Sequence, residues 1–199
     1  ANLRGVRRGA TVLSVERFAL EESEFLSLVG PNGSGKTTMI LALLRLVPMK
    51  AGTVSYKGAD VMKIRPVHQY RRNFAAVFQE PHLLNTTVYN NVAQGLGIRG
   101  ISRKDADRAV MTALERFGIT ALKGRGARNL SAGEAQRVSL ARAFALNPEI
   151  IFLDEPFASL DAPSRELILR DLETALGESR AAVVMATHDM ADALRLSRT

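Results

Sequence analysis

The chain has 199 residues, of which 46% are hydrophobic and 24% are charged, and this length suits one domain or one domain with a modest insertion. The composition argues against a largely disordered chain, and the absence of cysteine excludes disulfides, thiolate metal sites and cysteine nucleophiles. The net charge of +7 favours anionic partners, namely a nucleotide, acidic lipid head groups or nucleic acid, without choosing among them.

No segment is predicted to span a membrane. The longest strongly apolar stretch, residues 39–49, contains Arg45 and is well short of the ~20 residues that cross a bilayer. The N-terminal stretch is charged but has no apolar run beside it, so it is not typical of a secretory signal. We therefore expect the protein to remain inside the cell.

Predicted strands and helices alternate along the chain. Short apolar runs predict strands that are buried on both faces of a parallel sheet, at residues 25–30, 75–79, 150–155 and 181–188. Helix formers and capping signals predict helices over residues 36–47, 102–117, 131–146 and 161–177. Alternating runs around Gly58 predict a β-hairpin within residues 51–61.

These elements predict an α/β fold in a single domain that covers residues 1–199. We expect its core to comprise residues 1–79 and 136–199, with a mostly helical insertion over residues 80–135. The hairpin belongs to a small antiparallel β patch.

The stretch GPNGSGKTT, residues 30–38, matches the pattern G-x-x-x-x-G-K-[ST] between a predicted strand and a predicted helix. Its glycines let backbone N–H groups turn inward around a polyphosphate, and the helix N-terminus adds partial positive charge. Lys36 would reach the β and γ phosphates, and the Thr37 hydroxyl would bind Mg²⁺. The complete spacing and correct flanks disfavour the alternative of an ordinary glycine-rich turn.

Two further motifs carry polar residues that suit the same chemistry. In IIFLDEP, Asp154 at the end of a strand is placed to hold Mg²⁺ through water, and Glu155 to accept a proton from an attacking water. In NLSAGEAQR, Ser131 and Glu134 match a capping box that by itself does no more than start a helix.

Taken together, these motifs resemble those of the ATP-binding cassette (ABC) ATPases. The family's signature LSGGQ precedes the Walker B aspartate at a fixed distance, and here LSAGE begins at Leu130 and Asp154 follows 24 residues later. The resemblance covers nearly the whole chain and includes VFQEP with Gln79, ASLDA with Asp161 and ATHD with His188 as the Q-loop, D-loop and H-loop residues. It implies a RecA-like P-loop NTPase core, an inserted α-helical subdomain, and ATP and Mg²⁺ as cofactors.

The family resemblance also implies a head-to-tail dimer in which one chain's signature helix meets the γ-phosphate that the other chain's phosphate loop holds. By position, it assigns phosphate binding to Gly30, Pro31, Asn32, Gly33, Ser34, Gly35, Lys36, Thr37 and Thr38. It assigns Mg²⁺ to Thr37, Gln79 and Asp154, and catalysis to Glu155, His188, Lys36 and Gln79. It assigns nucleotide contacts across the dimer to Ser131 and Gly133, and cofactor binding to Asp161.

The chain departs from the family pattern at several positions. In the signature, Ala132 replaces a glycine and Glu134 replaces a glutamine, so we expect weaker affinity across the dimer unless the carboxylate turns toward its own helix start. The residue that stacks on adenine aligns with Arg7 or Val6, and arginine stacks on a base through cation-π and planar contact. Relatives continue beyond the H-loop, so we expect either a short member or a chain that lacks its end after Thr199.

The leading functional hypothesis is the ATP-hydrolysing subunit of a membrane transporter, peripheral on the inner face of the cell membrane. Separate permease subunits would dock beside Gln79 and the helical insertion, and a solute-binding protein would act indirectly. Residues 78–100 resemble bacterial uptake systems, including those for tungstate or molybdate. The alternatives are a non-transport ABC ATPase that acts on nucleic acid or ribosomes, whose usual coiled-coil arms, zinc cysteines or tandem cassettes are missing, and a nucleotide-binding protein without turnover.

Overall fold

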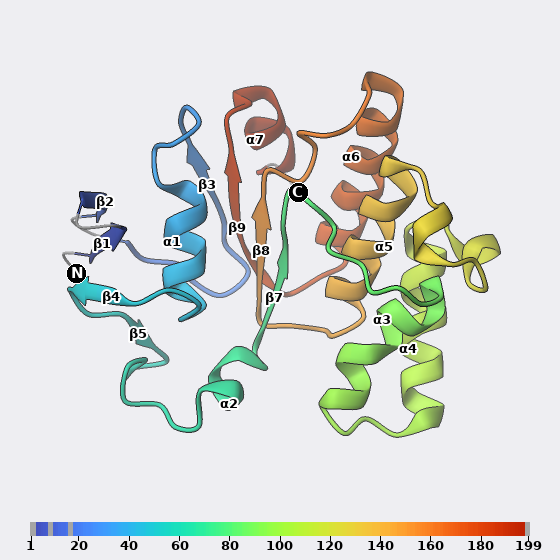
Figure 1. The fold of residues 1–199 in the computed structure, drawn as a ribbon, viewed down its shortest axis with the longest axis horizontal. Coiled ribbons are helices and arrows are strands. Elements are labelled where there is room, and N and C mark those ends of the chain that lie inside the picture. The colour runs from blue at the N-terminus through green and yellow to red at the C-terminus, as the bar shows by residue number, and fades with distance from the viewer. Residues whose placement is uncertain (1–2, 8–9, 16–17, 198–199) are drawn as a thin grey trace.

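The computed structural model describes residues 3–7, 10–15 and 18–197. A parallel sheet at its centre has the strand order β3-β9-β8-β7, formed by β3 (Phe25–Val29), β9 (Ala182–Thr187), β8 (Ile150–Asp154) and β7 (Phe74–Val77) (Figure 1). The four predicted strands are thereby confirmed, and β7, β8 and β9 are mostly buried as predicted, whereas β3 is half-buried and ends at the exposed Val29. Because parallel strands end at the same edge of a sheet, the segments that follow them are brought together there.

Alternate side chains of these strands enter two separate hydrophobic clusters. Ile151 and Leu153 pack with α5 (Ala132–Phe144) and α6 (Ala162–Gly177), whereas Phe152 and Val184 pack with α1 (Lys36–Leu43). Figure 1 shows α1 on one side of the sheet and α5 and α6 on the other. Burial on both faces explains why the strand sequences are nearly continuous apolar runs.

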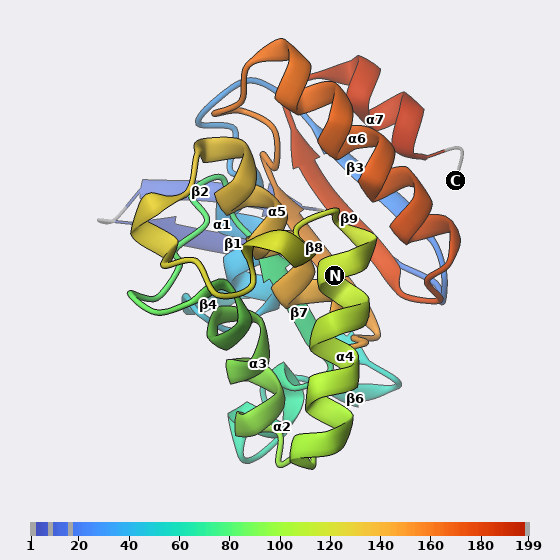
Figure 2. The ribbon, with the colours of Figure 1, turned by 90° about the vertical axis from the view of Figure 1, so that its right-hand side faces the viewer.

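The helices between β7 and β8 stand beside the sheet and pack on α5. They are α3 (Val88–Ile98), α4 (Arg103–Arg116) and the short 3₁₀ turns Thr120–Leu122 and Ala127–Asn129 (Figure 2). Ser102 caps α4 by accepting a hydrogen bond from the Asp105 N–H, as its sequence predicts. The Val110, Leu114 and Phe117 side chains are fully buried in the cluster that also holds α5.

The helix after the phosphate loop is shorter than predicted. It starts at Lys36 as expected but ends at Leu43, because Arg45 takes a left-handed backbone conformation with φ of 55°. The Arg45 guanidinium donates to the carbonyls of Val61 and Ile64, which fixes the turn against the neighbouring loop. Pro48 therefore lies beyond the helix end instead of causing it.

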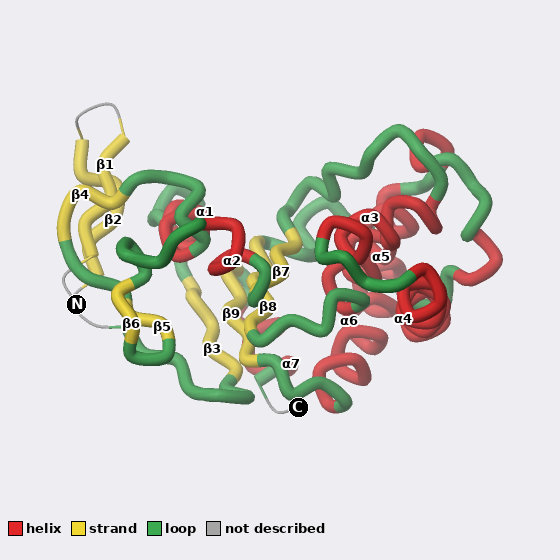
Figure 3. Tube along the Cα trace, turned by 90° about the horizontal axis from the view of Figure 1, so that it is seen from below, coloured by secondary structure: helices red, strands yellow, loops and turns green. Residues whose placement is uncertain are grey.

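Short antiparallel strands form the opposite end of the molecule from the helices α3 and α4 (Figure 3). One sheet has the order β2-β1-β4, with β1 (Leu3–Arg7), β2 (Ala10–Val15) and β4 (Met49–Ala51), and β5 (Ser55–Tyr56) pairs with β6 (Ala59–Asp60). Lys57 and Gly58 turn this hairpin with φ of 49° and 77°, the positive values that a tight hairpin turn needs. The predicted hairpin is confirmed, whereas β1 and β2 were not predicted.

The remaining helices are short. α2 (Val67–Arg71) precedes β7, and α7 (Met190–Leu196) follows β9. Among the described residues, no helix has both the length and the apolar character that crossing a membrane requires.

Helix α6 carries one buried and one exposed leucine, which together test the packing of the core. Replacing Leu172, which is fully buried, by Ala should lower the free energy of unfolding by about 2–5 kcal/mol, because the lost packing leaves a cavity. Leu167→Ala on the same helix, where 54% of the residue is exposed, should change it by less than about 0.5 kcal/mol. Urea unfolding of both variants measures the difference, and equal losses would contradict the described packing of α6.

Candidate active site

The glycine-rich loop between β3 and α1 is built to receive an anion. Gly33 and Gly35 have φ of 82° and 95°, which only glycine adopts without strain, and Gly35 is the N-cap of α1. No side chain caps α1 and no acidic residue lies in its first turn. The first N–H groups of the helix, together with its dipole, are therefore left for a negatively charged ligand.

The Lys36 ammonium lies across this loop. It donates to the Gly30 carbonyl at 2.8 Å and to the Pro31 carbonyl at 3.2 Å, and it forms an ion pair with Glu155 Oε1 at 3.2 Å. Only 10% of its side chain is exposed. The rest of the loop is accessible, since Pro31, Asn32, Gly33 and Ser34 are exposed and Thr38 is half-buried.

Asp154 and Thr37 are joined directly. Asp154 ends β8 with only 4% of the residue exposed, and its Oδ1 accepts a hydrogen bond from the Thr37 hydroxyl at 3.1 Å. Burial raises the pKa of Asp154 above its ordinary value, although the Thr37 hydroxyl opposes this shift. One hydroxyl and one carboxylate fit an oxygen-preferring cation that takes its other ligands from phosphate and water. No group of three or more acidic, histidine or cysteine side chains in the described residues forms a self-sufficient metal site.

Glu155 occupies an unusual backbone position between two catalytic candidates. Its φ of 48° is left-handed, which is uncommon for a residue with a side chain, and its N–H donates to the Ala186 carbonyl at 2.9 Å. Oε1 faces Lys36, and Oε2 lies 2.8 Å from Nδ1 of His188, which follows β9. The structure thus brings Lys36, Thr37, Asp154, Glu155 and His188 together at the carboxyl edge of the sheet.

Gln79 lies at the same edge without joining this cluster. It follows β7, which pairs in parallel with β8, and its side chain is exposed. No hydrogen bond joins Gln79 to Thr37 or Asp154 in the part of the chain that the structure describes. Its predicted place beside the metal site stays a prediction.

The signature segment lies on the other face of the sheet from α1. Ser131 caps α5 by accepting from the Glu134 N–H at 3.2 Å, and Glu134 Oε2 accepts from the Ser131 N–H at 2.7 Å, so the capping box is confirmed. Arg125 pairs with Glu134 Oε1 at 3.2 Å. The Glu134 carboxylate is therefore turned toward its own helix start. Arg125 was missed from the sequence because nothing in its spacing links it to the motif.

Gly133 lies where two helix starts pack closely. A Cβ on Gly133 would lie 3.2 Å from Oγ of Ser164, in the first turn of α6. Asp161 caps that helix by accepting from the Ser164 N–H at 2.7 Å, and this hydrogen bond lowers the pKa of Asp161. Ser131, Gly133 and Asp161 are thus gathered away from their own chain's phosphate loop.

Two predicted adenine contacts cannot be placed. Arg7 ends β1 and Val6 precedes it, and the side chains of both lie outside the described part of the structure.

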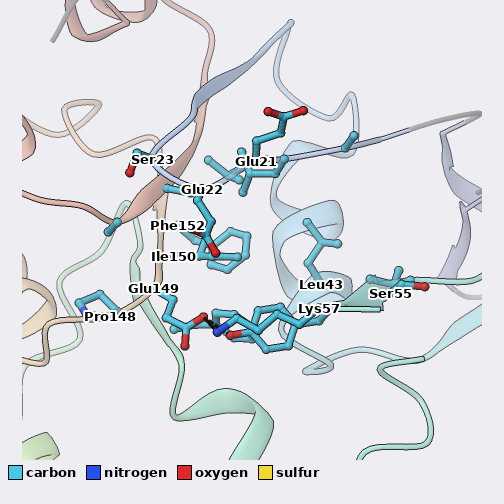
Figure 4. Close-up of a pocket in the computed structure, with 18 of the residues that line it drawn as sticks. Glu21, Glu22, Ser23, Leu43, Ser55, Lys57, Pro148, Glu149, Ile150 and Phe152 are labelled. Carbon is cyan, nitrogen blue, oxygen red and sulfur yellow. Dashed lines mark hydrogen bonds and ion pairs between the residues drawn. The ribbon is translucent and has the colours of Figure 1, made fainter. Parts of the chain in front are cut away.

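A large cavity of about 1110 Å³ lies at the opposite edge of the sheet (Figure 4). Its lining includes Glu149 and Ile150 at the start of β8 and Ala182 at the start of β9. In Figure 4 Lys57 points toward Glu149, with which it forms an ion pair at 2.7 Å. None of the motif residues lines this cavity, so its size does not make it the site of the phosphate chemistry.

Together, the parallel sheet, the loop before α1 and the Asp154–Glu155 pair after β8 define a P-loop nucleotide hydrolase. The family model described as "ABC transporter" matches residues 13–158. The chain belongs to the ABC transporter family and is an ATP-binding, ATP-hydrolysing member of it. The nucleic-acid alternative has no support among its relatives.

Three relatives illustrate the range of similarity. The tungstate uptake system ATP-binding protein TupC of Peptoclostridium acidaminophilum is 35% identical over 98% of this chain and 89% of its own length. The molybdate/tungstate import ATP-binding protein WtpC of Pyrococcus horikoshii is 35% identical, but the chain spans only 51% of it. The bacitracin export ATP-binding protein BceA of Halalkalibacterium halodurans is 37% identical over 90% of the chain and 72% of its own length.

A solved structure shares the fold. The dimeric post-hydrolysis state of the ATP-binding cassette MJ0796, bound to ADP and Pi, matches with a TM-score of 0.86 and 28% identity over 98% of this chain and 88% of that one. The expected P-loop NTPase core with its antiparallel patch and helices is thereby confirmed.

The capping role of Ser131 is testable without nucleotide. Ser131→Ala should lower the free energy of unfolding by about 1 kcal/mol, because the Glu134 N–H loses its acceptor, whereas Ser131→Thr should retain most of the stability. Urea unfolding of the three proteins gives the values. If the alanine variant is as stable as the unmodified chain, the hydroxyl does not cap α5.

Proposed function

We propose that this chain powers the uptake of an oxyanion by hydrolysing ATP between two head-to-tail copies. The observation that carries the hydrolytic part is the Glu155 carboxylate held between Lys36 and His188, beside the Asp154–Thr37 pair. The TupC and WtpC names support the oxyanion part, since both proteins are named for tungstate import.

The phosphate loop supplies the binding energy for the triphosphate. Gly33, Gly35 and the uncapped start of α1 present backbone N–H groups, and the Lys36 ammonium exchanges its contact with Glu155 for the β and γ phosphates. This exchange has a catalytic consequence, because the Glu155 carboxylate is released from its cation when the nucleotide arrives. Glu155 is thus free to act as a base only when the site holds ATP.

A magnesium ion fits the pair formed by Thr37 and Asp154, with Gln79 as a further ligand from the neighbouring strand end. Bound there, Mg²⁺ would neutralise charge on the β and γ phosphates. The Thr37 hydroxyl and Asp154 carboxylate already face each other, so little rearrangement is needed to hold the ion.

Hydrolysis proceeds by positioning and electrostatic stabilisation of phosphoryl transfer to water. Glu155 polarises the water and accepts its proton. His188 contacts the γ-phosphate and orients it, from a side chain that is 52% exposed and thus accessible to a ligand. Lys36 stabilises the negative charge that develops on the transferred group.

The second half of each site comes from the other copy. Ser131 and Gly133 lie at the start of α5, which packs on the opposite face of the sheet from α1 (Figure 1). In the dimer, this helix start meets a partner's γ-phosphate. Asp161, beside them at the start of α6, adds a contact across the dimer. The MJ0796 cassette, which shares this fold, is a dimer with ADP and Pi.

The assembly also needs a membrane partner. Permease subunits dock beside Gln79 and the helices of residues 80–135, which places the protein on the inner face of the membrane, and a solute-binding protein delivers the oxyanion. The packing of α3 and α4 on α5, which also lies against the sheet, supports the assignment of residues 80–135 as an insertion in one domain (Figure 2).

Dimer formation tests the two-chain site. Glu155→Gln should bind ATP without turnover and form a stable dimer, measured by size-exclusion chromatography with light scattering at saturating ATP and Mg²⁺. Adding Ser131→Glu should abolish this dimer, since the new carboxylate faces the partner's γ-phosphate.

The control for that experiment is Ser55→Glu in the Glu155→Gln background, because Ser55 lies in β5 by the large cavity at the other edge of the sheet. This control should still dimerise. A Glu155→Gln chain that stays monomeric, or a dimer indifferent to Ser131→Glu, counts against the shared site.

Transport in the source organism tests the substrate class. Deleting the gene should lower tungstate or molybdate accumulation. The unmodified gene and Lys57→Ala should restore it, whereas Lys36→Ala should not, because Lys57 pairs with Glu149 away from the phosphate loop. Accumulation is measured by elemental mass spectrometry. Unchanged accumulation together with increased bacitracin sensitivity would replace the import assignment by export.

A further inference from the structure

An arginine outside the recognised motifs connects two of them. Arg165, in the first turn of α6, reaches α7 and places its Nη2 2.7 Å from Oδ1 of Asp192 and in contact with Oδ2 of Asp189. One guanidinium nitrogen thus bridges two carboxylates of the next helix. Figures 1 and 2 both show α6 and α7 side by side.

On the α7 side, this contact fixes the residue that follows His188. Asp189 caps α7, since its Oδ1 accepts from the N–H groups of Ala191 at 2.8 Å and Asp192 at 3.3 Å. Its own N–H donates to the Thr187 hydroxyl at 3.0 Å. The backbone on both sides of His188 is therefore held, and the remaining freedom of Asp189 is removed by Arg165.

On the α6 side, the same arginine is one turn from the Asp161 cap. Its N–H donates to the Asp161 carbonyl at 2.9 Å, and the Asp161 side chain caps the same turn. A small cavity of about 180 Å³ separates this turn from the active-site carboxylate, and its lining includes Glu155, Leu160, Arg165 and His188. Arg165 therefore lies beside the Glu155–His188 pair without touching either residue through a hydrogen bond or ion pair.

The buried carboxylate of Asp192 gives a physical reason for the presence of Arg165. Only 4% of Asp192 is exposed, and burial raises the pKa of its carboxyl, which Arg165 opposes. A buried carboxylate without its cation is unfavourable, so the start of α7 would rearrange if Arg165 were lost. His188 directly precedes Asp189, the residue that caps this helix.

We propose that Arg165 is a positioning residue, which holds His188 against Glu155 and couples its placement to the Asp161 segment. The inference rests on the proposed function, since it assumes that His188 acts on the γ-phosphate. When Asp161 contacts a second copy, the first turn of α6 and Arg165 would transmit this contact to the position of His188. Hydrolysis would then depend on closure of the dimer.

A second arginine, Arg195, provides a matched control for variants of Arg165. Arg195, near the end of α7, pairs with Glu173 at 2.6 Å and with Glu166 at 2.7 Å, and thus also joins α7 to α6. These contacts involve neither His188 nor Asp189. They should keep the two helices packed when Arg165 is changed, and Arg195→Met is a matched control that removes both of its ion pairs between the same helices.

The experiment measures kcat and KM for ATP in the full chain with Mg²⁺. Arg165→Met should lower kcat about 10- to 100-fold with KM changed less than about 2-fold, because a misplaced catalytic group costs rate and Arg165 does not contact the phosphate loop. Arg165→Lys, which keeps one cation, should retain an intermediate kcat. Arg195→Met should leave kcat within about 2-fold.

The double variant Arg165→Met with His188→Ala separates positioning from general stability. If Arg165 acts through His188, adding Arg165→Met to His188→Ala should change kcat less than about 2-fold. Multiplicative losses, or an equal loss of kcat in Arg195→Met, would overturn the inference. A loss of ATP-dependent dimerisation in Arg165→Met within the Glu155→Gln background would also overturn it, in favour of a direct contact across the dimer. Absence of ATPase activity in the unmodified chain would instead refute the proposed function.

Discussion

The Glu155 side chain contacts an ammonium and a histidine ring, and these two contacts organise the edge of the sheet that carries the active site. Its carboxylate faces the Lys36 ammonium with one oxygen and the His188 ring with the other. The left-handed backbone at Glu155 sets this direction, and the hydrogen bond from its N–H to Ala186 ties it to β9. Three segments far apart in sequence follow parallel strands to this edge, and the Glu155 side chain joins them there.

Much of this could be predicted from the sequence because its causes are local. The glycines of the phosphate loop indicate a backbone that needs positive φ. The capping residue Ser102 indicates a helix start, and the apolar runs predict strands buried on both faces. The motif residues lie close together because they come after strands that end at the same edge of the sheet. The motifs single out Lys36, Thr37, Asp154, Glu155 and His188 from the sequence alone.

What the sequence did not predict depends on contacts between distant segments. The strands β1 and β2 lack the apolar runs that identified the central strands, and β1 also pairs with the later strand β4. Arg125 and Arg165 are two among the many arginines of a basic chain, and nothing in their spacing distinguishes the residue that pairs with Glu134 or Asp192. The end of α1 at Leu43 likewise depends on carbonyls of a later loop that hold Arg45.

The two helix starts proposed to hold one triphosphate are not equivalent. The start of α1 has no side-chain cap and no acidic residue, so its N–H groups have no internal competitor for phosphate. At the start of α5, two N–H groups are already satisfied within the chain, because Ser131 and Glu134 cap each other and Arg125 holds the carboxylate. A partner's γ-phosphate must displace these contacts or add to them. In the proposed dimer, ATP would therefore bind to the phosphate loop first, and closure of the dimer would be the weaker and later step, which would allow the two copies to separate after each hydrolysis.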